Sequence, residues 1–303
     1  MPRVITPARA SAISLEACTD ALLDSRFDPQ DEASLLHAAD LLARLGMDRD
    51  FLADILLDEL TTRHKGDAAR QSYGPQVIML SQPKGADFFI RANIWPSPAE
   101  PMMRASGSAA FVYGLPHDHN FHFLTLGYFG PGYWSDYYEY DYGAVAGWRG
   151  EPVGLRFIGR ERLDQGKLMH YRAHRDIHAQ FPADALSVSL NVMHVDPAQG
   201  WHDQYRFDLE QGRIAGVLNH GASEAALRIA VGLGSEEALD LAERFAFGHP
   251  SGRMRLHALE ALTGVAADAA ARDDLWRRAE SSGNQMVAAE AKNYRITLPH
   301  HIV

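Results

Sequence analysis

The chain has little of the chemistry that marks a secreted or membrane protein. Cys18 is the single cysteine among 303 residues, so a scaffold built on internal disulfides is excluded. No apolar run approaches the roughly 20 residues of a membrane-spanning helix. Glu16 and Asp20 interrupt the N-terminal stretch that would otherwise be examined as a signal-peptide core. We therefore expect a cytoplasmic protein with no membrane partner.

Positive charge is also scarce. Lys and Arg number 29 against 39 Asp and Glu, which gives a formal net charge of -10 with all 15 histidines neutral. Because nucleic acids attract basic surfaces, a nucleic-acid partner is not expected. P-loop, dinucleotide-binding, Gly-x-Ser-x-Gly, His-Glu-x-x-His and Cys-x-x-Cys motifs are all absent. With 46% apolar and 22% charged residues, the composition is that of a folded globular protein.

Hydrophobic periodicity divides the chain into three parts, and it predicts an α+β fold. In residues 1–74 the spacing is helical, with Leu35, Ala39 and Leu42 on one face and Gly46 as a stop. In residues 75–218, short β-branched and aromatic runs recur about every ten residues, which predicts a β-sandwich or barrel of about eight strands. The runs are residues 76–80, 87–95, 108–115, 122–129, 137–142, 153–163, 166–181, 185–193 and 204–214.

Residues 219–303 are rich in alanine and leucine at helical spacing, which predicts an all-helical domain. Two similar helical segments, residues 252–262 and 284–294, begin about 32 residues apart. This period is typical of stacked helical hairpins of the HEAT type, although a plain helical bundle is an equally simple interpretation.

The segment YGLPHDHNFHFLTLGYFGPGYW, residues 113–134, contains a candidate metal site. Side chains two apart on a strand share a face, so His117 and His119 would present two imidazoles to one metal ion. His122, three residues further on, would face the other way. A third ligand is expected downstream, where His170, His174 and His178 are spaced by four. Periodicity does not choose among these three, because this spacing gives a common face on a helix and on a strand.

Carboxylates offer another ligand set. A site with two histidines and one carboxylate is common among iron oxygenases. Asp176 would share a strand face with His178, and Glu139 lies in a nearby aromatic run. The residues therefore leave both a three-histidine and a mixed site open.

Residues 113–134 resemble the first motif of the cupin superfamily, which runs His-x-His, three or four residues, Glu, six residues, Gly. His117, His119 and Gly130 match this motif, whereas Phe123 and Leu124 stand where the glutamate would be. The resemblance implies a cupin-like jelly-roll barrel. Without the glutamate, it implies a three-histidine metal site like that of thiol dioxygenases of the cysteine dioxygenase type.

The resemblance to thiol dioxygenases implies ferrous iron as the cofactor and molecular oxygen as the co-substrate. It also implies that His178, which lies shortly before the strand at 185–193, is the third metal ligand. The resemblance covers roughly residues 75–195. Asn191 and Met193 stand where thiol dioxygenases have a histidine and a tyrosine, so the chain departs from a plain cysteine dioxygenase.

Other residues of this region are candidates for binding and catalysis. The aromatic stretch 127–143 is either barrel core or a pocket wall, and its Tyr138 and Tyr140 could orient a substrate or pass a proton. Tyr128 and His174 are further candidate substrate contacts. Arg91, in an apolar strand, is either an anchor for a substrate carboxylate or a salt-bridged edge residue.

The sequence as a whole favours a mononuclear non-haem iron oxygenase acting on a small amino-acid-like or thiol substrate. One alternative is an oxygenase that modifies a peptide or a carrier-bound residue held by the helical domain. Another is a non-catalytic binding protein whose helices are an interaction scaffold. A homodimer is left open.

Overall fold

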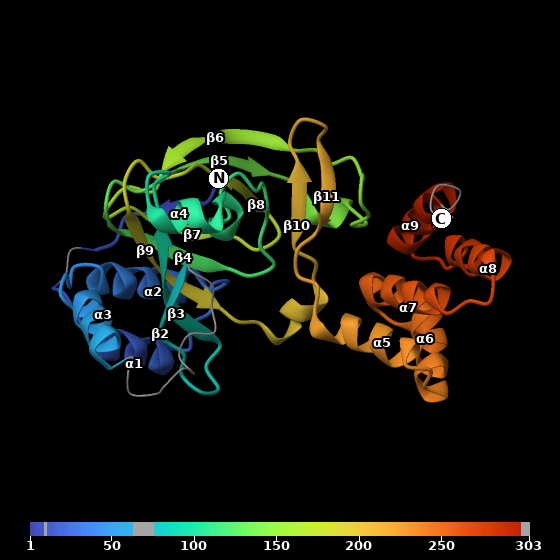
Figure 1. The fold of residues 1–303 in the computed structure, drawn as a ribbon. Coiled ribbons are helices and arrows are strands. Elements are labelled where there is room, and N and C mark those ends of the chain that lie inside the picture. The colour runs from blue at the N-terminus through green and yellow to red at the C-terminus, as the bar shows by residue number, and fades with distance from the viewer. Residues whose placement is uncertain (9–10, 63–75, 298–303) are drawn as a thin grey trace. The chain divides into compact units, whose positions relative to one another are not determined.

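The computed structural model describes residues 1–8, 11–62 and 76–297, which fall into two compact units (Figure 1). The first, the sheet unit, contains Met1–Tyr142 and Gly154–Gln199. The second, the helical unit, contains Gly143–Val153 and the residues from Gly200 onward. The predicted domain boundaries at residues 74 and 218 stay predictions.

The sheet unit has mixed α/β architecture with two antiparallel sheets. The larger sheet has six strands in the order β1-β7-β4-β9-β3-β2. They are β1 (Arg3–Ile5), β7 (Leu168–Tyr171), β4 (Phe123–Phe129), β9 (Ser187–His194), β3 (Phe88–Trp95) and β2 (Val77–Ser81). The smaller sheet has the order β6-β5-β8. Its strands are β6 (Arg156–Arg162), β5 (Trp134–Glu139) and β8 (Asp176–Gln180). This pairing gives two separate sheets, so the closed barrel that the sequence predicts is not shown.

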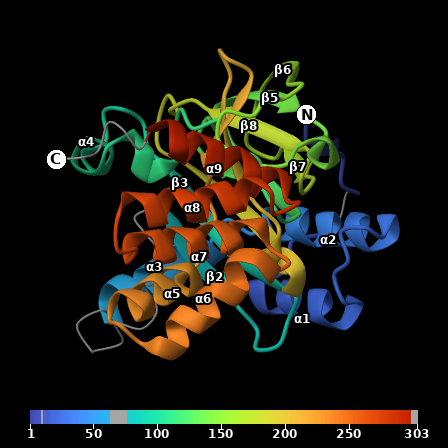
Figure 2. The same ribbon diagram turned by 90° about the vertical axis from the view of Figure 1, so that its right-hand side faces the viewer.

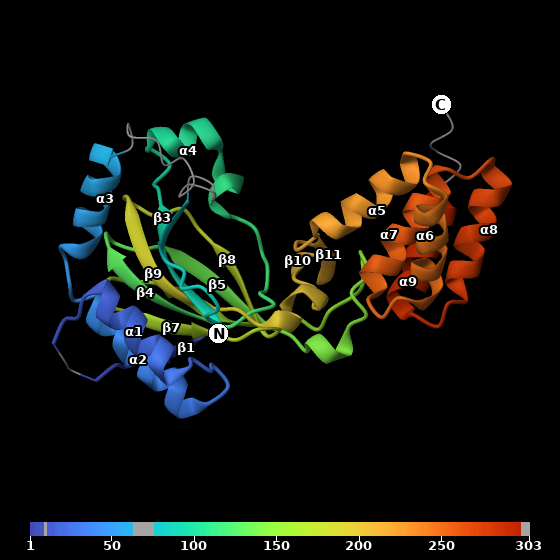
Figure 3. The same cartoon turned by 90° about the horizontal axis from the view of Figure 1, so that it is seen from below.

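Three N-terminal helices cover one face of the larger sheet (Figure 3). They are α1 (Leu15–Ser25), α2 (Glu32–Leu45) and α3 (Phe51–Thr62). Alternation along β3 explains the packing, because Phe88, Ile90 and Ala92 join the helix side chains in one buried cluster. Asp31 fixes the start of α2 by accepting hydrogen bonds from the backbone N–H groups of Ala33 and Ser34.

The opposite face of the larger sheet, called here the inner face, packs against the smaller sheet. Trp95 of β3, Phe123 of β4 and Tyr171 of β7 share a second buried cluster with Tyr137 of β5. Burying aromatic rings between two sheets contributes about 25 cal/mol for each Å² removed from water. This inner cluster is where the candidate site lies.

A glycine turn carries the chain from the larger sheet to the smaller one. Gly130 and Gly132 have φ of +77° and +76°, which L side chains rarely adopt. A Cβ on Gly132 would also lie 1.9 Å from the carbonyl oxygen of Leu163. Glycine is therefore required here for local geometry, including at Gly130, the position that matches the cupin motif.

Two predicted strands are corrected by the structure. Residues 108–115 contain a 3-10 turn, Ser108–Phe111, after the short helix α4 (Pro101–Ser106), instead of a strand. Residues 166–181 form two strands, β7 and β8, separated by a turn at residues 172–175. His174 lies in that turn with a φ of 58°, so the expected common face of His170, His174 and His178 does not exist.

The helical unit contains a hairpin and five described helices. The hairpin pairs β10 (Tyr205–Asp208) with β11 (Arg213–Val217). The helices are α5 (Ala222–Gly232), α6 (Glu236–Gly248), α7 (Gly252–Gly264), α8 (Ala269–Glu280) and α9 (Gln285–Thr297). Figure 2 shows α7, α8 and α9 lying side by side in this unit. The helices occupy the predicted segments, while their assignment to the HEAT type stays a prediction. In the part of the chain that is described, no helix is long and apolar enough to span a membrane.

Candidate metal centre

Three histidines from two segments of the sheet unit converge in the inner cluster. His117 and His178 form an isolated antiparallel bridge, with backbone N···O distances of 3.1 and 2.9 Å. His119 is held by the turn before β8, because its carbonyl oxygen accepts from the backbone N–H of His174 at 2.8 Å. One candidate ligand atom from each ring lies within 4.8 Å of the other two. Of the three downstream histidines, His178 is thus the one that joins His117 and His119 in this cluster.

The ring nitrogens face one another. The Nε2 atom of His178 lies 3.1 Å from Nε2 of His119 and 3.2 Å from Nε2 of His117. His117 Nδ1 lies 2.8 Å from the Leu115 carbonyl oxygen, which can only accept, so Nδ1 carries the proton. The lone pair of His117 is therefore on Nε2 and points at the other rings.

The three imidazoles are neutral at neutral pH. Burial lowers the pKa of His117 to about 4, and it lowers those of His119 and His178 well below the usual 6.5. Their neighbouring imidazoles lower the pKa of His119 and His178 further. Three neutral imidazole nitrogens that converge in a buried site are a donor set for a divalent transition metal. The residues therefore fit a divalent transition metal, while the choice of iron stays a prediction.

Aromatic side chains surround the three histidines. The rings of Phe121 and Phe123 lie 4.9 Å from that of His119. The Tyr171 ring lies 5.0 Å from the His178 ring, and Tyr171 exchanges a 3.0 Å hydrogen bond with Tyr137. Burial raises the pKa of both phenols, that of Tyr137 to about 12, so both keep their protons at neutral pH.

The two tyrosines predicted as catalytic make other contacts. Tyr137 pairs with His178 across the sheet, so Tyr138 points to the opposite face of β5, where its ring contacts Phe157. Tyr140 donates a 2.5 Å hydrogen bond to the buried carboxylate of Asp118, between the two histidines of the motif. The tyrosines beside the histidines are Tyr137, which belongs to the aromatic stretch 127–143, and Tyr171, which the sequence does not single out. The strand register, which pairs Tyr137 with His178, distinguishes Tyr137 from its neighbours.

The predicted substrate contacts are also separated by the structure. Tyr128 lies on the helix side of β4, where its hydroxyl donates to the carbonyl oxygens of Asp48 and Arg49. The ring of His174 packs on Tyr142, with 4.2 Å between centroids. Arg91 is on the inner face, where its charge is among the groups that act on His119.

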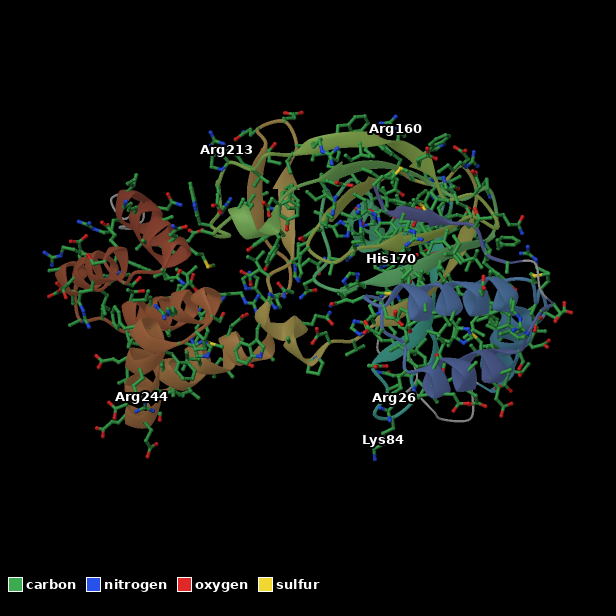
Figure 4. The ribbon with its side chains drawn as sticks, turned by 180° about the vertical axis from the view of Figure 1, so that it is seen from behind. Arg26, Lys84, Arg160, His170, Arg213 and Arg244 are labelled. Atoms are coloured by element: carbon green, nitrogen blue, oxygen red, sulfur yellow. The ribbon has the colours of Figure 1, made fainter. Side chains whose placement is uncertain are left out.

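The alternative ligands have other contacts. Figure 4 labels His170 on β7, close to the N-terminal helices, and its Nε2 lies 3.2 Å from Nδ1 of His122. Asp176 and Glu139 both bind the Arg172 guanidinium, at 2.6 and 2.8 Å. An ion pair of this kind keeps both carboxylates on Arg172, away from the histidines.

A second group of candidate ligands lies in the helical unit, comprising His220, Glu224 and His257. Glu224 accepts hydrogen bonds from the Gly221 backbone N–H and from Arg253. His257 pairs with Glu260 at 2.9 Å. Glu224 and His257 thus have partners within the protein, as expected of residues in a helix cap and an ion-pair network.

Comparison with known proteins does not place the chain in a family, since no family model and no curated protein matches it. One similar solved structure is described as that of the DMSP lyases RdDddP and RnDddQII, with 13% identity and a TM-score of 0.24. That match covers 44% of this chain and 52% of the other, so the chain spans about half of that protein's length.

Two further solved structures are similar at the same level. A candidate mannose-6-phosphate isomerase from Ralstonia eutropha JMP134 has 13% identity and a TM-score of 0.22, covering 43% of this chain and 94% of that one. The DMSP lyase DddQ from Ruegeria pomeroyi DSS-3 has 10% identity and a TM-score of 0.23, covering 64% and 79%. TM-scores this low support no conclusion about fold or function, so the description of the fold and of the site rests on the geometry above.

Proposed function

We propose that the chain is a metal-dependent enzyme of the cupin type, in which His117, His119 and His178 bind ferrous iron. The observation that carries the proposal is the convergence of three buried, neutral imidazoles on one point. The match of His117, His119 and Gly130 to the cupin motif supports it. The reaction we propose is oxygenation of a small amino-acid-like or thiol substrate by molecular oxygen.

Three imidazole ligands are uncharged and leave coordination positions free, so bound iron would supply sites for an anionic substrate and for oxygen. The chain's own residues would exclude water and orient the substrate. The rings of Phe121 and Phe123 pack beside that of His119, and the three histidines form a buried group. Within such a dry site, polar interactions are stronger than in water.

Tyr137 and Tyr171 would hold protons beside the site. Their hydroxyl groups share one hydrogen bond, and their raised pKa values keep both protonated at neutral pH. The pair is thus suited to donate a hydrogen bond to a bound substrate, a role that the sequence alone gave to Tyr138 and Tyr140.

The test is oxygen uptake by protein reconstituted anaerobically with ferrous iron, screened against small thiols and amino acids. We expect uptake with at least one of them, and we expect its loss in His178→Leu. His122→Gln is the matched control, since His122 lies in the same segment as the motif but contacts His170 instead. Absence of uptake with every compound, or full activity in His178→Leu, would overturn the proposal.

A further inference from the structure

A row of polar side chains crosses the inner face of the larger sheet next to the three histidines. Arg91 of β3 lies opposite Asn191 of β9, and Asn191 lies opposite Thr125 of β4. Side chains at such paired positions are about 5 Å apart. Asn93 follows two residues after Arg91 and shares its face of β3.

Asn93, Asn191 and Thr125 are buried, and each has a polar atom without a hydrogen-bond partner among the described residues. The exposed fractions of Asn93, Asn191 and Thr125 are 7%, 3% and 1%. Asn93 Oδ1, Asn191 Nδ2 and Thr125 Oγ1 have no hydrogen-bond partner among the described residues. Native proteins satisfy nearly all buried polar groups, since each unmet one costs free energy. Three unmet groups on one face indicate that a ligand supplies the missing hydrogen bonds.

The row is adjacent to the candidate metal centre. Phe123, two residues before Thr125 on the same face of β4, has its ring 4.9 Å from that of His119. On the other side, Thr125 pairs with Met169, whose sulfur lies 3.9 Å from the Tyr137 hydroxyl. A molecule of a few heavy atoms bound at the row would therefore lie beside the histidines.

The chemistry of the row defines the ligand. Arg91 supplies a positive charge, and Asn191 and Thr125 supply neutral hydrogen-bond donors, which together suit a carboxylate. The free oxygen of Asn93 accepts, so it suits a hydroxyl or amino group next to that carboxylate. No member of the row carries a negative charge that would repel such a ligand.

We propose that Arg91, Asn191, Thr125 and Asn93 bind the head group of an α-hydroxy or α-amino acid. The inference rests on the proposed function in one respect, namely that the rest of the molecule reaches the metal. Binding of the head group itself needs no metal, so the two proposals can fail separately.

The experiment is isothermal titration of the full-length, metal-free protein with three probes. L-lactate has both the carboxylate and the donor, propionate lacks the donor, and L-lactamide lacks the charge. We expect L-lactate to bind about tenfold or more tightly than either analogue, because a site with buried polar groups rejects a ligand that leaves them unpaired. Equal affinity for the three, or no binding of L-lactate, would overturn the proposal.

Variants separate a binding role from a structural one. Thr125→Val and Asn191→Leu should weaken L-lactate binding about tenfold or more, while their melting temperatures stay at or above that of the wild type. A structural role would instead lower the melting temperature and leave binding unchanged, which would overturn the proposal. Thr263→Val, on α7 of the helical unit, is the matched control and should bind L-lactate as the wild type does.

The same titrations on metal-loaded protein distinguish the two proposals. Protein that takes up iron but binds the three probes equally would refute the head-group site and leave the metal site standing. Protein that discriminates among the probes but takes up no metal would refute the metal site and leave the head-group site standing.

Discussion

Metal binding should stabilise the sheet unit through the three histidines, and His119→Leu should abolish that effect. His119 Nε2 lies 3.1 Å from the His178 nitrogen, and His119 Nδ1 has no hydrogen-bond partner in the described part of the chain. Leucine fills a similar space and carries no polar atom, so the metal-free variant should still fold. The variant therefore removes a ligand without removing the site's surroundings.

The size of the effect follows from linkage. A metal at 1,000 times its Kd adds about 4 kcal/mol to the free energy of unfolding. For a unit the size of the sheet unit, this raises Tm by roughly 8–16 °C. If the loss of one ligand weakens binding about a thousandfold, the same metal concentration adds only about 0.4 kcal/mol, or roughly 1 °C.

The assay is scanning calorimetry of metal-free and cobalt-loaded protein, for the wild type, His119→Leu and the control His122→Leu. The wild type and His122→Leu should show the full rise in Tm, and His119→Leu almost none. A full rise in His119→Leu would refute the reasoning, because the metal would then bind elsewhere. An equal loss in His122→Leu would also refute it, since the effect would not be specific to the three histidines.

Three further predictions concern neighbouring side chains. Tyr140→Phe removes a 2.5 Å hydrogen bond to buried Asp118, so calorimetry should show a loss of about 1.5–3 kcal/mol, or roughly 3–12 °C in Tm; an unchanged Tm would contradict this contact. Tyr137→Phe should lower oxygen uptake about tenfold or more, while Tyr138→Phe on the opposite face of β5 should leave it near the wild-type rate. An equal loss of oxygen uptake in Tyr137→Phe and Tyr138→Phe would contradict the role proposed for Tyr137. Burial and a neighbouring imidazole lower the pKa of His170 from 6.5 to about 4, so between these values the unfolded chain binds the extra proton and stability falls as the pH is lowered. The buried histidines of the metal centre add to the acid loss in the same way, so urea unfolding from pH 7 to 4 should show a loss that is about 3 kcal/mol smaller in His170→Gln than in the wild type; an identical pH profile in the variant would contradict the assignment.

Local patterns in the sequence predict much of this architecture. Alternation places Phe88 and Ile90 of β3 on the helix side, and Gly46 follows the last residue of α2 as expected. The pair His117 and His119 is readable as a candidate site from its spacing alone. These features depend on neighbours in the chain, which is why they are visible without a structure.

Features set by strand register are not visible in the same way. The spacing of His170 and His178 implies a common face, but the turn at residues 172–175 reverses the chain between them. Likewise, Tyr137 and Tyr138 are equivalent in the sequence, and only the pairing of Tyr137 with His178 distinguishes them. A one-residue change of register exchanges the faces of a strand, so no local pattern can settle these choices.

Ion pairs between residues of different segments are also not predictable from the sequence. Asp176 is two residues from His178 on one strand, which makes it a reasonable ligand by sequence. The structure places it on Arg172, together with Glu139. The polar row is hidden from the sequence for the same reason, because Arg91, Asn191 and Thr125 belong to three strands that are distant in the chain.

The central claim, that three converging histidines bind iron, is tested most directly by elemental analysis. The protein should be purified anaerobically without a metal-binding tag and compared with His117→Ala. We predict about one iron per wild-type chain and none in the variant, with both chains folded by circular dichroism. A folded wild-type chain without iron, or an unchanged iron content in His117→Ala, would contradict the account.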